Sequence, residues 1–225
     1  MKVFGACWDN HPTCLFTAWR ETVNPVDFVL VPGDISWAMR LNEVACDLAS
    51  LGELPGHIVI LRGNHDYWWQ SLRQVREALP PNMFALQNDC LPLAGSEWVV
   101  CGTRGWQLPE QGGASTTNGS DKKIYERELM RLEMSLQAAK RIGAKRLIAM
   151  MHFPPAQQDG KPTGFTSLLE RYEVEKCVYG HLHGEATRYA LHGNHRGVTY
   201  QLVSADFLNF KPLHLASLSV EDGAE

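Results

Sequence analysis

The sequence has no hydrophobic run long enough to cross a membrane. Its longest apolar stretches, such as residues 28–31 and 147–151, are far shorter than the roughly 20 residues that span a bilayer. The uncharged stretch between Lys2 and Asp9 is also too short for a secretory signal. We therefore expect a cytoplasmic protein without a membrane segment.

An excess of positive charge is missing as well. The 225 residues contain 21 Lys and Arg against 25 Asp and Glu, and the formal net charge is −4. This balance does not favour a surface that holds polyanions by counterion release, so nucleic acid is not an expected partner. A local basic or metal-bearing pocket stays open.

The cysteines form no C-x-x-C pair and no tightly spaced group. We expect reduced, mostly buried thiols rather than a disulfide framework. The six positions are Cys7, Cys14, Cys46, Cys90, Cys101 and Cys177.

Helical and β-branched patterns alternate in the first half of the chain. Strands are predicted at 28–34 and 57–66, each followed by a helical pattern, at 36–51 and 71–80. This βαβα order favours parallel strands with right-handed crossovers.

The second half is richer in strands. Residues 83–106 have the pattern of a hairpin region, and a polar loop at 107–121 either covers a site or is disordered. An apolar stripe then predicts a long helix from Tyr125 to Gly143. Further strands and hairpins are predicted at 146–152, 177–184, 186–205 and 212–218. Because there is neither a repeat nor a linker, we expect a single α/β domain over residues 1–225.

Four predicted strands end on side chains that can bind a metal ion. These side chains are Asp34, Asn64 with His65, His152, and His181 with His183. The loops beyond the carboxyl ends of parallel strands converge on one crevice, so the side chains can meet. A glycine precedes three of these candidates, at Gly33, Gly63 and Gly180, and it suits a sharp backbone turn.

Imidazole, carboxylate and amide ligands suit a pair of divalent transition metal ions, such as Mn, Fe or Zn. Two such ions about 3.5–4 Å apart clamp a phosphoryl group and supply hydroxide for in-line attack on phosphorus. The pattern therefore predicts a metal-dependent phosphoester hydrolase.

The same strings resemble motifs two to five of the calcineurin-like metallophosphoesterase superfamily, in the same order and across residues 33–183. They are Gly33-Asp34, Gly63-Asn64-His65-Asp66, His152 and Gly180-His181-Leu182-His183. The surrounding strings PGDISWAM, LRGNHDYWW and YGHLHGEA also resemble a bacterial subgroup of predicted phosphohydrolases. The resemblance implies a sandwich of two mixed β-sheets flanked by helices.

The resemblance also implies a role for each matching residue. Asp34 would bridge two metal ions, and His183 would serve the first of them. His65 would contact the substrate phosphate and act as general acid, which suits a side chain that titrates near neutral pH. Asn64, His152 and His181 would complete the second metal site.

The first motif of the family, Asp-x-His at the end of the first strand, has one candidate here, Asp9-Asn10-His11. However, MKVFGACWDNH resembles the segment just after that motif, so the chain is also consistent with a start at an internal methionine, without the first strand. The first metal site would then keep only Asp34 and His183. We accordingly expect nearer one tight ion than the two of a complete site. A catalytically impaired metal-binding or interaction protein is the alternative function.

Several residues have two interpretations. Asp34 is a metal ligand or a helix N-cap, and Asp66 orients His65 or caps the next helix. Arg62 and Arg104 bind phosphate as forked donors or are solvated surface residues.

Three tryptophans also have two interpretations, and the other histidines have one. Trp68, Trp69 and Trp106 line the substrate pocket or pack in the core. The second Gly-Asn-His string, at 193–195, is interpreted as a hairpin turn with no ligand role. His57, His192 and His214 are interpreted as structural. The choice between phosphomonoester and phosphodiester, the substrate itself and the oligomeric state stay open.

Overall fold

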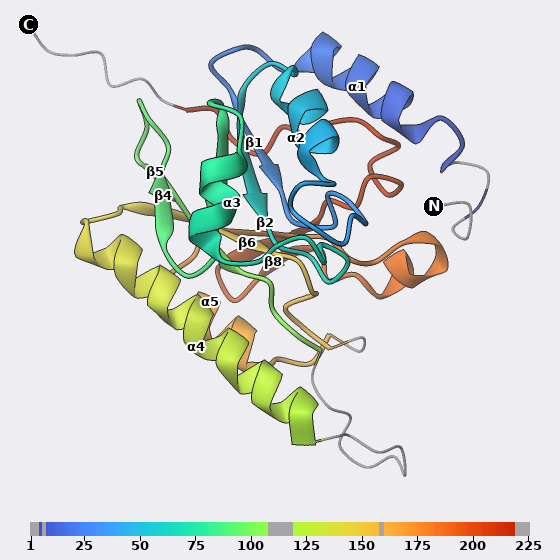
Figure 1. Cartoon of the computed structure of the whole chain (residues 1–225). Helices are drawn as coiled ribbons and strands as arrows, with labels where there is room; N and C mark the ends of the chain where they lie inside the picture. The colour runs from blue at the N-terminus through green and yellow to red at the C-terminus, as the bar shows by residue number, and fades with distance from the viewer. Residues whose placement is uncertain (1–4, 6–7, 108–118, 158–159, 219–225) are drawn as a thin grey trace, which may run out of the picture.

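Two β-sheets pack face to face, with helices on both outer sides (Figure 1). The computed structural model describes residues 5, 8–107, 119–157 and 160–218. The fold class predicted from the sequence, a sandwich of two sheets flanked by helices, is confirmed.

The first sheet has three parallel strands in the order β1-β2-β3. They are β1 (Phe28–Val31), β2 (His57–Leu61) and β3 (Met83–Leu86). Strand β2 consists of large apolar and β-branched residues after its first position and is buried from Ile58 to Leu61, as expected of a strand covered on both faces. Three helices cover the outer face of this sheet, α1 (His11–Thr22), α2 (Ala45–Gly52) and α3 (Leu72–Ala78).

The second sheet has six strands in the order β4-β5-β6-β7-β9-β8. Its central strands β5, β6, β7 and β9 are parallel, whereas the edge pairs β4-β5 and β8-β9 are antiparallel hairpins. The strands are β4 (Cys90–Pro92), β5 (Trp98–Thr103), β6 (Arg146–Met151), β7 (Lys176–Tyr179), β8 (Gly193–His195) and β9 (Val198–Leu202). The outer side holds α4 (Gly119–Arg141) and α5 (Gly164–Arg171), and the 3-10 helix η3 (Gly184–Tyr189) follows β7.

Three apolar clusters fill the space between these layers. One lies between the two sheets and includes Leu61, Val100 and Ile148. The long helix α4 buries Leu132 and Leu136 against the second sheet, and these residues belong to the apolar stripe that predicted it. Gly143, with φ 75°, follows the end of this helix, as a left-handed glycine commonly does.

The helix predicted at 36–51 is wrong in its first half. Within this range only residues from Ala45 onward are helical, in α2. The backbone N–H groups of Ile35 and Ser36 donate to the Asp66 carboxylate, and those of Met39 and Arg40 donate to Glu43. These side-chain acceptors stabilise a loop in place of a helical turn.

Other local predictions also need correction. The predicted hairpin region at 83–106 is split, because β3 pairs with β2 in the first sheet and only β4 and β5 form a hairpin. Residues 212–218 form no strand. Helices α1 and α5 were not predicted, although Thr163 and Thr166 form a capping box at the start of α5. The loop expected at 107–121 lies mostly outside the described residues.

Strand β1 occupies one edge of the first sheet in the described part of the chain. A cavity of about 690 Å³ lies beside it, lined by α1, β1 and residues between 203 and 218. A missing first strand and the single-domain assignment over 1–225 stay predictions.

Five cysteines fall within the described residues, and all five are free thiols. The expectation that most are buried is wrong, because only Cys101 and Cys177 are buried while Cys14 and Cys46 are exposed. Among the described helices, none combines the length and apolar character needed to cross a bilayer.

Candidate metal centre

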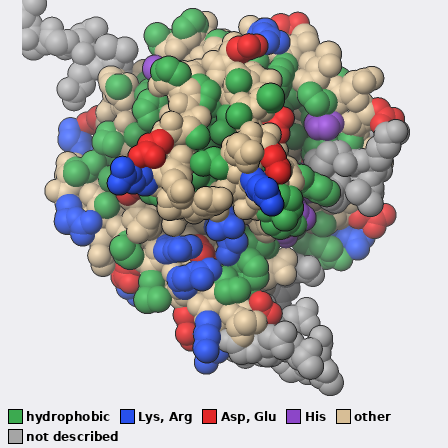
Figure 2. All heavy atoms as spheres, in the orientation of Figure 1, with side chains coloured by type: hydrophobic (Ala, Val, Ile, Leu, Met, Phe, Trp, Pro, Cys, Tyr) green, Lys and Arg blue, Asp and Glu red, His purple; other side chains and the backbone are tan. Residues whose placement is uncertain are grey.

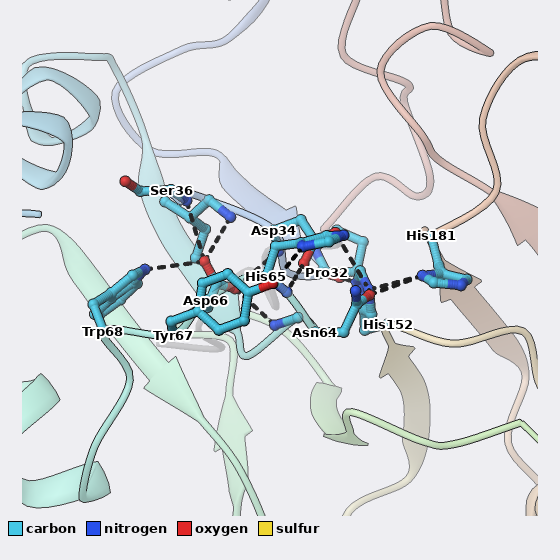
Figure 3. Close-up of polar contacts among 12 residues, drawn as sticks. Pro32, Asp34, Ser36, Asn64, His65, Asp66, Tyr67, Trp68, His152 and His181 are labelled. Atoms are coloured by element: carbon cyan, nitrogen blue, oxygen red, sulfur yellow. Dashed lines mark hydrogen bonds and ion pairs between the residues drawn. The ribbon is translucent and has the colours of Figure 1, made fainter. Parts of the chain in front are cut away.

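The carboxyl ends of β1, β2, β6 and β7 bring four of the predicted ligands together (Figure 3). Asp34, His152 and His181 each offer a ligand atom, and these atoms lie within 4.8 Å of one another. Asn64 joins them, because its Oδ1 lies 2.6 Å from His152 Nε2 and 2.9 Å from His181 Nδ1. The convergence expected of parallel strand ends is therefore present.

Two glycines allow the loops that carry Asp34 and Asn64 to approach this closely. A Cβ atom on Gly33, whose φ is 94°, would lie 2.6 Å from the backbone of Gly63. A Cβ atom on Gly63 would lie 2.1 Å from Asp34 Oδ1. Gly180 is different, since a Cβ there would meet only Pro32 at 3.6 Å. The chain still turns sharply at this point, because His181 has φ 72° and the Leu182 N–H donates to the Gly180 carbonyl at 2.9 Å.

Asp66 joins the same two loops through its fully buried carboxylate (Figure 3). Its oxygens accept hydrogen bonds from five donors. They are the backbone N–H groups of Asp34 (2.8 Å), Ile35 (2.8 Å), Ser36 (3.1 Å) and Gly63 (2.7 Å), and the indole N–H of Trp68 (3.1 Å). Burial raises the pKa of Asp66, and the hydrogen bonds from Gly63 and Ser36 oppose this. Asp66 thus neither contacts the His65 ring nor caps a helix, because α3 is capped by Ser71.

The two histidines at the centre present lone pairs to a common point. His152 Nδ1 lies 2.9 Å from the Pro32 carbonyl, so this nitrogen carries the proton and Nε2 faces Asn64 as an acceptor. Burial lowers the pKa of His152. Burial, together with the neighbouring His152 ring, lowers the pKa of His181 to about 4. Both rings are therefore neutral near pH 7 and need not lose a proton before they bind a metal.

Two of the distances among these atoms match the ligand shell of one ion, whereas the 2.6 Å between Asn64 Oδ1 and His152 Nε2 is slightly shorter than in such a shell. Ligand atoms about 2.0–2.2 Å from one ion, at tetrahedral or octahedral angles, lie about 2.8–3.6 Å apart. Here His152 Nε2 lies 3.2 Å from His181 Nδ1 and 3.6 Å from Asp34 Oδ2. At most one ring proton, on His181 Nδ1, is available to the three other atoms, Asp34 Oδ2, Asn64 Oδ1 and His152 Nε2, so a cation satisfies this group better than hydrogen bonds can.

Asp34 is held in a geometry that serves this site. Its φ is 57°, and its Oδ1 accepts a hydrogen bond from the backbone N–H of His65 at 2.8 Å. The next helix begins only at Ala45, which excludes the helix N-cap interpretation of Asp34.

His65 lies beside the centre without belonging to the cluster of four. Its Nδ1 is 3.0 Å from the hydroxyl of Tyr67, which leaves Nε2 for another partner. The ring stacks on Trp37, with centroids 4.9 Å apart and an interplanar angle of 24°. Trp37 and Tyr67 are 51% and 47% exposed, so the surroundings of His65 are aromatic and open.

His183 stands apart from the other predicted ligands. Its Nδ1 lies 2.9 Å from Asp206 Oδ1, and the backbone N–H of Gly184 donates to the other carboxylate oxygen. Burial alone would raise the pKa of Asp206, but the hydrogen bonds from His183 and Gly184 outweigh it and hold this pKa below its usual range. Carboxylate partners of this kind orient histidine rings at metal sites.

The Asp9-Asn10-His11 string does not enter the cluster of ligand atoms around Asp34. Asp9 is exposed, and His11 Nδ1 lies 2.9 Å from the Trp8 carbonyl at the start of α1. Trp8 packs edge-on against the ring of His183 at 5.3 Å. Trp8, which directly precedes the string, therefore contacts His183, while the string itself lies outside the group of ligand atoms.

The structure also separates the alternatives for the other residues. Trp68 and Trp69 are 0% and 2% exposed and pack in the core, whereas Trp106 packs against Phe153 and under Arg104. The interpretation of the second Gly-Asn-His string as a hairpin turn is wrong, because residues Gly193–His195 form strand β8 of an exposed hairpin. The turn lies after this strand, at Arg196 and Gly197, which both have positive φ.

Sequence reasoning missed Asp206, Tyr67 and Trp37. Asp206 carried a usable signal, because it follows β9, the neighbour of β7 in the sheet, and is a carboxylate beyond a strand end. For Tyr67 and Trp37 the sequence holds no such signal, since their contacts with His65 depend on how the two loops fold.

Comparison with known proteins shows the family of the chain. A search of the curated proteins found no match. Among solved structures, TT1561 of Thermus thermophilus is similar, with 15% identity, a TM-score of 0.48 and coverage of 69% of either chain. The family model described as calcineurin-like phosphoesterase matches residues 9–185. Because this match spans more than half of the chain, the protein belongs to the calcineurin-like phosphoesterase family.

Proposed function

We propose that the protein hydrolyses phosphoesters at a metal centre held by Asp34, Asn64, His152 and His181, with His65 as the general acid. Family membership implies metal-dependent phosphoester hydrolysis. The observation that carries the proposal is the convergence of four potential ligand atoms from four strand ends.

When bound, a divalent ion would act as a Lewis acid and lower the pKa of the attacking water. Mn, Fe and Zn all suit two imidazoles with a carboxylate and an amide oxygen. The protein's part is to hold these side chains in position before the ion arrives. Asp66 does so for the two loops, and the Pro32 carbonyl does so for the His152 ring.

His65 is the residue that moves a proton in this proposal. In the protonated ring, Nδ1–H donates to the hydroxyl oxygen of Tyr67, which leaves Nε2–H for the substrate. The ring donates the Nε2 proton to the leaving-group oxygen and becomes a neutral imidazole with its remaining proton on Nδ1. The open aromatic surroundings, Trp37 and Tyr67, leave room for the leaving group.

Metal binding without turnover is the second candidate function. It is favoured because the described residues hold one group of His, Cys, Asp or Glu side chains close enough to share an ion, Asp34 with His152 and His181, and no second such group. Substrate, metal identity and cytoplasmic location stay predictions.

An assay with a chromogenic phosphomonoester and phosphodiester tests the proposal. After treatment with a chelator, added Mn²⁺ should restore turnover of at least one ester. Asp34→Asn should lower that turnover at least ~100-fold, because metal-ion stabilisation of the transition state is worth several kcal/mol.

Asp27→Asn is the matched control, because the Asp27 carboxylate accepts hydrogen bonds from Asn24 in an exposed turn, and this variant should keep full turnover. Metal binding with no turnover of either ester would support the second candidate. Salt-dependent retention of DNA or RNA would instead indicate nucleic-acid binding.

A further inference from the structure

A cluster of arginines lies next to the metal centre, although the chain as a whole is acidic. Arg62 directly follows β2 and stands two residues before Asn64. Arg104 directly follows β5, and its carbonyl accepts hydrogen bonds from the backbone N–H groups of His152 and Phe153 at 3.2 and 2.8 Å. Two strands that end beside the ligands thus end on an arginine as well.

The cluster is not balanced by its own carboxylates. Helix α4 contributes Glu128, which is 1% exposed. One oxygen of this residue lies 2.8, 3.4 and 3.8 Å from the guanidinium groups of Arg131, Arg127 and Arg104. Its other oxygen accepts a hydrogen bond from Thr103 at 2.7 Å. Three arginines therefore share one carboxylate oxygen. Figure 2 shows Lys and Arg side chains grouped on the surface over the middle of α4.

Arg62 and Arg104 also keep buried donors that nothing satisfies. Within the described residues, the Nε atoms of both side chains are buried and have no hydrogen-bond partner. Arg62 makes no side-chain hydrogen bond or ion pair with any described residue. A buried N–H without an acceptor is costly, and so is a cation near like charges.

The electrostatic surroundings of Arg62 agree with this. The carboxylates of Asp66 and Glu128 attract the Arg62 guanidinium, whereas Arg131 and Arg127 repel it. The Asp66 carboxylate already accepts five hydrogen bonds from other donors. An oxyanion is the ligand that offers several acceptors and negative charge at one point, and forked guanidinium groups match its geometry.

We propose that Arg62 and Arg104 form an anion site that binds a second phosphate group of the substrate, beside the one that is hydrolysed. The assignment to substrate rests on the proposed function, because both arginines adjoin residues of the metal centre. A substrate with two phosphate groups, such as a sugar bisphosphate, has the required chemistry.

Binding of inorganic pyrophosphate to the metal-free full chain tests the anion site without any turnover. In excess chelator, wild-type protein should bind pyrophosphate in isothermal titration and should unfold at a higher temperature with it. Arg62→Met should weaken this binding at least ~10-fold, as the loss of a charged hydrogen-bond donor implies. Without pyrophosphate it should unfold at a temperature no lower than wild type, because Arg62 has no partner to lose.

Arg73→Met is the control, since Arg73 is an exposed arginine paired with Glu77 on α3, and its variant should bind like wild type. The site is refuted if wild type does not bind pyrophosphate, or if the two methionine variants bind it equally.

A second titration, with Mn²⁺-loaded protein, tests whether the anion belongs to the substrate. Wild type should bind 1,3-propanebisphosphonate at least ~10-fold more tightly than methylphosphonate, because the second group reaches the arginines. Arg62→Met should remove this difference. A difference that survives in Arg62→Met would overturn the assignment to substrate, even if pyrophosphate binding is lost. Neither titration requires catalysis, so failure of the proposed function would be seen separately in the ester assay.

Discussion

His65→Ala should lower kcat by ~10²–10⁴-fold for an alkyl phosphoester, which is the usual contribution of a general acid. The loss should be much smaller for a p-nitrophenyl ester, because nitrophenolate leaves without protonation. Affinity for Mn²⁺ should not change, since His65 lies outside the group of ligand atoms. Steady-state kinetics with the two esters and a metal titration measure these effects.

His192→Ala is the matched control, because this exposed histidine lies beside the β8-β9 hairpin and its variant should keep full activity. Equal losses for both esters, or weakened metal binding in His65→Ala, would contradict a role as general acid.

Asp66→Asn should lower the free energy of unfolding by about 3–5 kcal/mol. An amide nitrogen in place of Oδ2 would face the N–H groups of Asp34 and Gly63, and hydrogen bonds to a charged group contribute about 1.5–3 kcal/mol each. Urea denaturation of the metal-free protein measures this loss.

The same variant should bind metal ~10–100-fold more weakly, because Asp66 fixes the loops that carry Asp34 and Asn64. Asp27→Asn, at an exposed turn, should cost about 1 kcal/mol or less. Wild-type stability in Asp66→Asn would show that the two loops hold together without this carboxylate.

The sequence predicted the meeting of Asp34, Asn64, His152 and His181 because parallel strands place their carboxyl ends at one edge of a sheet. That argument needs only the strands and their order of ligands. The position of His183 could not be predicted in this way, because its ring contacts Asp206, which follows strand β9. Strand order also does not predict that Asp66 holds together the loops that carry Asp34 and Asn64.

Local structure was predicted where periodicity decides it. Helix α4 has an apolar stripe over several turns and was found. Residues 36–44 also have helical spacing, yet the Asp66 and Glu43 carboxylates capture backbone N–H groups there. Helix α1 had a signal, with Pro12 in its first turn, but residues 9–11 before it were interpreted only as a metal motif.

Anomalous diffraction from crystals soaked in Mn²⁺ tests the central claim most directly. The account predicts one strong peak about 2.0–2.2 Å from Asp34, Asn64 Oδ1, His152 Nε2 and His181 Nδ1. It would be contradicted by the absence of a peak at this position, or by two strong peaks with Asp9 and His11 coordinating one of them.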